Sequence, residues 1–92
     1  MKLKFTLLGQ LGQLAGRESL KRTCADNASC EDVLNELAQS HGEAFQSILL
    51  TEEGAIRPSV MVLINDHPMD KETTCFLQDG DQITILPAIA GG

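Results

Sequence analysis

The feature that most constrains the fold of this chain is one helical pattern enclosed between segments that alternate like strands. Residues 2–8 alternate apolar and polar side chains, which predicts a half-buried strand. Residues 30–41 carry apolar side chains at helical spacing instead, and strand patterns then resume and end with residues 82–86. We therefore expect an α+β domain in which one main helix packs on one face of a mixed sheet of four to five strands.

Local signals mark both ends of the predicted helix, residues 30–41. Ser29 stands three residues before Asp32 as in a capping box, although Glu or Gln is more usual at that place. His41 offers the last turn a side chain that can carry positive charge, and the glycine that follows suits a C-terminal cap. Residues 44–49 predict a second, short helix.

Turn signals divide the rest of the chain. The three glycines of residues 9–16 predict a loose turn or a wide hairpin loop. Asn65 and Asp66 predict a second turn, and residues 78–81 predict a third. The remaining strands are expected at residues 19–24, on an edge of the sheet, and at residues 60–64, 67–69 and 82–86.

The apolar positions of these segments predict the core. The run at residues 60–64 is apolar at odd and even positions, so either both of its faces are covered or one of them is a docking surface. The side chains expected in the core are Phe5, Leu7, Val33, Leu34, Leu37, Val60, Val62, Ile64, Ile83 and Ile85.

Composition excludes several classes of function. The 92 residues carry a formal net charge of −6, whereas a nucleic-acid surface would be basic. No run approaches the roughly 18 apolar residues of a membrane-spanning helix, and the first residues alternate like a strand rather than forming a signal peptide. We expect one mature cytoplasmic domain with no nucleic-acid or membrane partner.

The cysteines and histidines form no motif with a known chemistry. Cys24, Cys30 and Cys75 are odd in number and include no Cys-x-x-Cys pair, so we expect reduced thiols and no metal site. His41 and His67 are candidate bases for a nucleophilic cysteine, but nothing in the spacing pairs them with one. The spacing therefore does not favour a catalytic cysteine, and we expect His41 to lie at a helix end and His67 at a turn.

The chain closes with an apolar strand, a proline and two glycines. Pro87 cannot donate to a strand ladder, so it should end the last strand and separate a domain at residues 1–87 from a flexible tail at residues 88–92. Five residues in extended form span about 17 Å, which is enough to reach a buried site of another protein. Gly91 would let the backbone pass a narrow channel, and the α-carboxylate of Gly92 would be the reactive group.

These motifs resemble those of the MoaD/ThiS sulfur-carrier family, which has the ubiquitin-like β-grasp fold. Residues 79–92 resemble the family's ending: an acidic Gly-Asp turn, a strand, a proline, a short apolar linker and Gly-Gly. Residues 57–65 are similar to its central strand and Asn turn, and residues 15–18 resemble the segment after its first strand. One departure is Asp66, where the family often has glycine after the asparagine. The resemblance covers nearly the whole chain and is concentrated in the last fourteen residues.

The resemblance implies a function as a protein cosubstrate and not as an enzyme. An E1-like adenylating enzyme of the MoeB/ThiF type would use ATP to adenylate Gly92, whose acyl-adenylate is then converted to a thiocarboxylate. The sulfur would pass to an accepting enzyme. We expect the large subunit of molybdopterin synthase first, and a cysteine-synthase-like enzyme, as for a CysO-like donor, second. No cofactor would be bound by the carrier itself.

A docking surface for these partners is expected beside the tail. Its candidate residues are Met61, Leu63, Leu86, Pro87, Ile89 and Ala90. An exposed apolar patch of this kind is what a partner enzyme would bury. The alternative is that Met61 and Leu63 pack under the second helix or a loop.

Two other functions use the same residues differently. A ubiquitin-like protein modifier would form an isopeptide bond between Gly92 and lysines of target proteins, and it needs the same tail as a sulfur carrier. A passive binding module would keep its function when Gly91 and Gly92 are deleted. The sequence leaves the sulfur acceptor and the oligomeric state open, as well as any trimming of a longer precursor.

Overall fold

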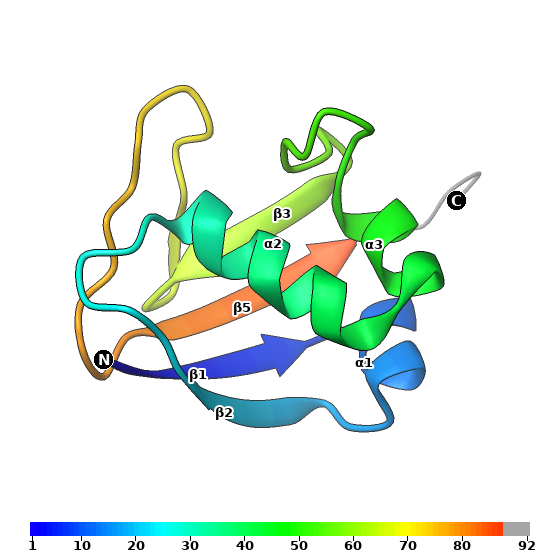
Figure 1. Ribbon diagram of the computed structural model, residues 1–92, viewed down its shortest axis with the longest axis horizontal. Coiled ribbons are helices and arrows are strands. Elements are labelled where there is room, and N and C mark those ends of the chain that lie inside the picture. The colour runs from blue at the N-terminus through cyan, green and yellow to red at the C-terminus, as the bar shows by residue number, and fades with distance from the viewer. Residues whose placement is uncertain (88–92) are drawn as a thin grey trace.

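The computed structural model describes residues 1–87, which form one mixed sheet and three helices (Figure 1). The predicted tail, residues 88–92, lies outside the described residues. In chain order the elements are β1 (Lys2–Leu7), α1 (Gln10–Ala15), β2 (Ser19–Thr23), α2 (Cys30–His41), α3 (Glu43–Leu49), β3 (Val60–Ile64), β4 (His67–Pro68) and β5 (Gln82–Pro87).

The sheet has the strand order β2-β1-β5-β3-β4. β1 and β5 run parallel at its centre, with Phe5 opposite Ile83 and Leu7 opposite Ile85, and the other neighbouring pairs are antiparallel. The strands nearest the two ends of the chain are thus joined along the middle of the domain. The mixed sheet and the edge position of β2 are both confirmed.

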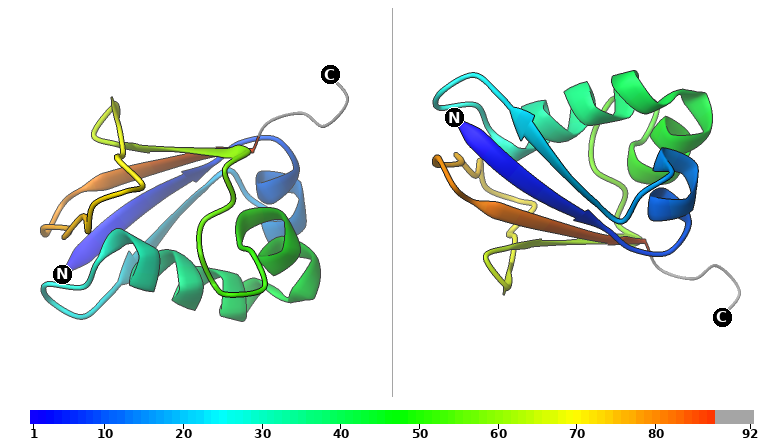
Figure 2. Two further views of the ribbon diagram at one scale, coloured as in Figure 1. Left: turned by 90° about the horizontal axis from the view of Figure 1, so that it is seen from above. Right: turned by 90° about the horizontal axis from the view of Figure 1, so that it is seen from below.

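One face of the sheet is covered by helices, and the other carries none (Figure 2). Inward-pointing side chains of the central strands, such as Phe5, Ile83 and Ile85, meet Leu34 and Leu37 of α2 and are fully shielded from solvent. This arrangement buries the apolar stripe of α2 against the apolar face of the sheet. Of the predicted core residues only Ile64 differs, because it is partly buried at the edge of the core.

Helix α2 occupies the residues that its pattern predicts. The Ser29 hydroxyl accepts a hydrogen bond from the Asp32 N–H at 3.1 Å and so caps the first turn. The acidic side chains of Glu31 and Asp32 lie in that turn, where they favour the positive end of the helix dipole. His41 lies in the last turn, as predicted, and its ring stacks on Phe45 of α3 at 4.9 Å between centroids.

The prediction of a loop at residues 9–16 is wrong, because this segment contains α1. Gly9 precedes the helix with φ 60°, and Gly16 ends it in the left-handed conformation with φ 77°. Gly12 faces β1 so closely that a Cβ atom built on it would lie 2.6 Å from the Leu7 carbonyl oxygen. The glycines that indicate a loop therefore flank a helix at Gly9 and Gly16 and allow its close packing on β1 at Gly12. Leu11 of the same helix is buried in the core.

The turn between β3 and β4 is a two-residue hairpin. Asn65 has φ 51° and Asp66 has φ 69°, the left-handed pair that a right-twisted two-residue hairpin requires. Asn and Asp tolerate this conformation better than other non-glycine residues, which is why Asp66 can stand in place of glycine. The hairpin returns the chain to pair His67 with Ile64 and Pro68 with Leu63.

Candidate functional site

The helix-free face of the sheet carries an apolar pair where β3 and β5 lie side by side. Met61 stands directly opposite Leu86, and their side chains are 52% and 40% exposed. Both point away from α2, because their neighbours Val60, Val62 and Ile85 occupy the buried positions of the same strands. Large apolar side chains that lie next to each other and are exposed to solvent form a surface that a partner protein can cover.

A shallow apolar groove continues from this pair toward the edge strand β4. Its walls include Pro58, Met61, Pro68, Met69, Leu86 and Pro87. Pro87 is the last described residue of β5 and lies opposite Val60. The groove therefore lies beside the end of the described part of β5, five positions before Gly92.

Lys71 fixes the wall of this groove. Its ammonium group donates hydrogen bonds to the carbonyl oxygens of Arg57 at 3.0 Å, of Pro58 at 3.4 Å and of Val60. Burial lowers the pKa of Lys71 below its ordinary value. A single side chain thus ties the loop after β4 to the start of β3. The groove lining, as far as the chain is described, includes no side-chain carboxylate.

The predicted docking residues fall into three groups. Met61 and Leu86 are exposed, and Pro87 is partly buried beside them. Leu63 is half-buried next to β4, and it is not in contact with the main core. The alternative that Met61 packs under a helix or a loop is therefore wrong. The remaining predicted residues, Ile89, Ala90, Gly91 and Gly92, lie outside the described residues.

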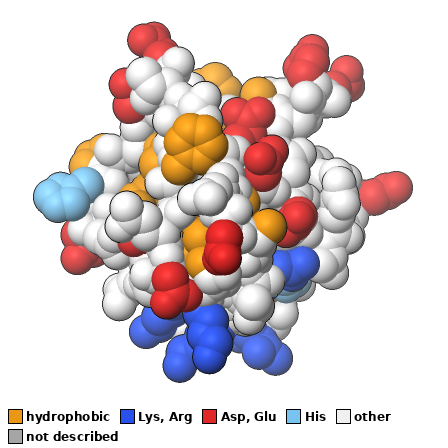
Figure 3. All heavy atoms as spheres, turned by 60° about the vertical axis from the view of Figure 1, so that its left-hand side comes forward, with side chains coloured by type: hydrophobic (Ala, Val, Ile, Leu, Met, Phe, Trp, Pro, Cys, Tyr) orange, Lys and Arg blue, Asp and Glu red, His pale blue; other side chains and the backbone are white. Residues whose placement is uncertain are grey.

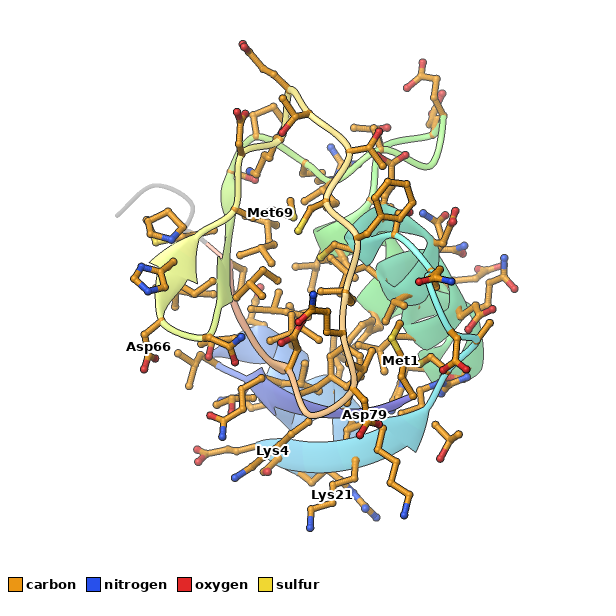
Figure 4. All side chains as sticks on the ribbon, turned by 90° about the vertical axis from the view of Figure 1, so that its left-hand side faces the viewer. Met1, Lys4, Lys21, Asp66, Met69 and Asp79 are labelled. Atoms are coloured by element: carbon orange, nitrogen blue, oxygen red, sulfur yellow. The ribbon has the colours of Figure 1, made fainter. Side chains whose placement is uncertain are left out.

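The other end of the same face is basic, which the sequence reading missed. Lys4 stands directly opposite Lys21, and Lys2 lies two residues away on the same side of β1 (Figure 4). Figure 3 shows Lys and Arg side chains gathered along this edge, apart from most of the acidic groups. Like charges directly opposite each other cost stability in an antiparallel pair. Alternation in residues 2–8 was the available signal, because it puts Lys2 and Lys4 together on the outer face.

Residues 1–87 hold no metal-binding cluster, and two of their cysteines are buried. Within residues 1–87 no three His, Cys, Asp or Glu side chains are placed to hold a metal ion. Burial raises the pKa of Cys30 to about 12 and raises the pKa of Cys24, so both thiols are protonated in the resting protein near neutral pH. No helix in this part of the chain is long and apolar enough to cross a membrane.

A mixed sheet of order β2-β1-β5-β3-β4 with α2 across one face defines a ubiquitin-like β-grasp protein. Residues 5–92 match the ThiS family, and the chain belongs to that family. The family and its relatives comprise small sulfur carriers and ubiquitin-like modifiers.

Relatives of both kinds match the chain over its full length. The small archaeal modifier protein 3 of Haloferax volcanii is 32% identical over 100% of both chains. The molybdopterin synthase sulfur carrier subunit of Chlamydomonas reinhardtii is 28% identical, also over 100% of both chains. The crystal structure of SAMP1 from Haloferax volcanii superimposes with a TM-score of 0.86 over 100% of both chains at 22% identity, which shows the shared fold.

Proposed function

We propose that this chain is a sulfur carrier, activated at the carboxylate of Gly92 and used by partner enzymes as a cosubstrate. The observation that carries the proposal is the apolar Met61–Leu86 pair at the end of β5, next to the residues that lead to Gly-Gly. A carrier needs a surface that docks and a carboxylate within reach of that surface. Here the groove and the terminal residues are five positions apart, about 17 Å when extended.

The chemistry assigns catalysis to the partners. A carboxylate is a poor electrophile, so an E1-like adenylating enzyme of the MoeB/ThiF type would transfer AMP from ATP to Gly92, with pyrophosphate as the leaving group. A hydrosulfide ion supplied by a partner then attacks the acyl carbon and AMP departs, which leaves a thiocarboxylate. In this scheme the carrier supplies no acid, base or metal to these steps, and it would bind no cofactor. In this role the chain is not an enzyme.

For the sulfur acceptor we propose the large subunit of molybdopterin synthase, with a cysteine- or homocysteine-forming enzyme as the second choice. The full-length relationship to a molybdopterin synthase sulfur carrier subunit supports the first assignment. Incubating the purified thiocarboxylate form of the carrier with each kind of acceptor enzyme distinguishes the two assignments by which enzyme consumes the sulfur. Sulfur consumed only by the amino-acid-forming enzyme would overturn the molybdopterin assignment.

The alternative function is a protein modifier joined through Gly92 to lysines of target proteins. The full-length relationship to a small archaeal modifier protein supports it. Both functions require adenylation of the same carboxylate, so the product distinguishes them.

Intact mass spectrometry of the protein from its own cells tests both functions. A carrier should show one oxygen replaced by sulfur at Gly92, whereas a modifier should leave Gly-Gly remnants on lysines of many other proteins. A variant with one uncleaved residue added after Gly92 should lose either activity, while a Phe76→Thr variant, changed far from the groove, should keep it. Normal sulfur delivery by the extended variant contradicts the proposal.

A further inference from the structure

Two cysteines lie together between the start of α2 and the loop after β4. Ser29 and Phe76 form an isolated antiparallel bridge, and the residues next to them, Cys30 and Cys75, are joined by a backbone hydrogen bond. Two backbone hydrogen bonds flank the bridge. The Cys30 N–H donates to the Cys75 carbonyl oxygen at 2.7 Å, and the Leu77 N–H donates to the Ala28 carbonyl oxygen at 3.2 Å.

This backbone bond makes the two cysteines close neighbours. Residues joined by a backbone hydrogen bond of an antiparallel pair have Cα atoms about 5.5 Å apart. Disulfides span Cα separations of about 4.4–6.8 Å. Both cysteines also line the same hollow, between the start of α2 and the loop after β4, and Cys75 packs against the core that contains Cys30.

The two thiols differ in access. Cys30 is 1% exposed, whereas Cys75 is partly exposed on a loop of residues 69–81 that has no helix or strand (Figure 4 views this end). An external reagent therefore meets Cys75 first. Cys24, the third thiol, is buried beside Met1 at the end of β2, where its N–H donates to the Met1 carbonyl oxygen at 2.8 Å.

We propose that Cys30 and Cys75 are an oxidative modification site that forms a reversible disulfide with a low-molecular-weight disulfide, such as oxidised glutathione, as the oxidant. The Cys75 thiolate attacks one sulfur of the oxidant and releases the first small thiol, which takes up the Cys75 proton. The Cys30 sulfur then attacks the Cys75 sulfur, the second small thiol departs with the Cys30 proton, and two electrons have passed to the oxidant. In a reducing compartment such a bond is transient, as in redox-sensing proteins.

The bond would join the loop after β4 to the first turn of α2. Residues 75–77 and 28–30 are already paired through the backbone, so the cross-link requires little displacement of either segment. The exposed Met61–Leu86 pair lies on the helix-free face of the sheet, whereas the cysteines lie between α2 and the loop after β4 (Figure 3 shows the side of the molecule with this loop). Met69 and Lys71 of that loop line both the groove and the cysteine hollow. The bond forms without the Gly92 carboxylate, so it can be tested apart from the sulfur-carrier proposal.

The test is oxidation of the reduced, full-length, folded protein with excess oxidised glutathione. Titration of thiols after unfolding should fall from three per chain to one, with no retained glutathione, and digestion without reductant should yield a peptide pair joining Cys30 to Cys75. The melting temperature should rise by at least about 5 °C and return on reduction. The control variant Cys24→Ala should behave in the same way.

Two variants and one condition decide the outcome. Cys30→Ala should retain one glutathione on Cys75 and form no internal bond, and Cys75→Ala should lose the reaction in the folded state. The proposal is overturned if the wild-type chain keeps glutathione on separate cysteines. It is equally overturned if the bond includes Cys24, or if Cys30 and Cys75 join only after the protein is unfolded in urea.

Discussion

Replacing the apolar pair on the outer face tests the docking surface directly. The double variant Met61→Thr/Leu86→Thr removes both side chains and keeps residues that favour strands. Full burial of a Leu or Met side chain is worth about 1.5–3 kcal/mol. Met61 is 52% and Leu86 is 40% exposed, so about half of that energy is still available to a partner.

The expected effect on partner binding follows from that fraction. Each residue contributes about 0.7–1.5 kcal/mol, and part of it remains with the Thr methyl group, so the pair should account for about 1.5–2 kcal/mol. This corresponds to a 10- to 30-fold weaker association, since about 1.4 kcal/mol is a factor of ten. The free energy of unfolding of the carrier itself should change by no more than about 0.5 kcal/mol per substitution, because both side chains lie on the solvent-exposed surface of the folded protein.

Carrier-dependent exchange of pyrophosphate into ATP, catalysed by the adenylating enzyme, measures this effect. The KM for the carrier should rise 10- to 30-fold, at about 1.4 kcal/mol per factor of ten, while kcat stays near the wild-type value. Two other exposed apolar side chains provide controls, Leu14 on α1 and Phe76 on the loop before β5. The reasoning fails if the double variant binds normally while Leu14→Thr or Phe76→Thr raises KM.

Three further predictions concern the fold, each measured by urea unfolding. Gly12→Ala should lower the free energy of unfolding by about 1–3 kcal/mol despite the better helix propensity of Ala, because its Cβ would lie 2.6 Å from the Leu7 carbonyl oxygen. Gln13→Ala on the exposed side of α1 is its control, and equal stability of the two variants would contradict the close packing. Ser29→Ala should cost about 1 kcal/mol through loss of the cap, and Ser29→Asp should restore most of it. Burial raises the pKa of the Cys30 thiol from 9.0 to about 12. The stability that the buried neutral thiol contributes is therefore fully present below pH 9 and is lost as the pH rises toward 12. The free energy of unfolding of Cys30→Ala should therefore fall less steeply above pH 9 than that of the wild type. Equal slopes for the two proteins would show that Cys30 does not cause this pH dependence.

Much of the candidate site could be predicted because it depends on alternation along single strands. The positions of Met61 and Leu86 outside the core follow from the buried positions beside them. The groove could not be predicted, since it needs Lys71 and Met69 to cross from the loop after β4 to the start of β3. The basic end of the face was also missed, because the pairing of Lys4 with Lys21 depends on register between two strands.

The sequence by itself determined the elements whose causes are local. Helix α2 begins and ends at the predicted residues because its apolar spacing, the Ser29 cap and the following glycine all lie within one short segment. The strands and the Asn65–Asp66 turn are local in the same sense, since side-chain alternation and backbone preference act between near neighbours.

Only the tertiary structure decided which segments meet. Helix α1 is stabilised by tertiary contacts, because Gly12 can approach Leu7 and Leu11 enters a core built by the rest of the chain. Its glycines by themselves do not favour a helix, so the segment alone gives no helical signal. The parallel pairing of β1 with β5 joins residues nearly eighty positions apart, and the same folding places Cys30 beside Cys75. Such contacts arise from the burial of surfaces shared by distant segments, which residue patterns within one segment cannot specify.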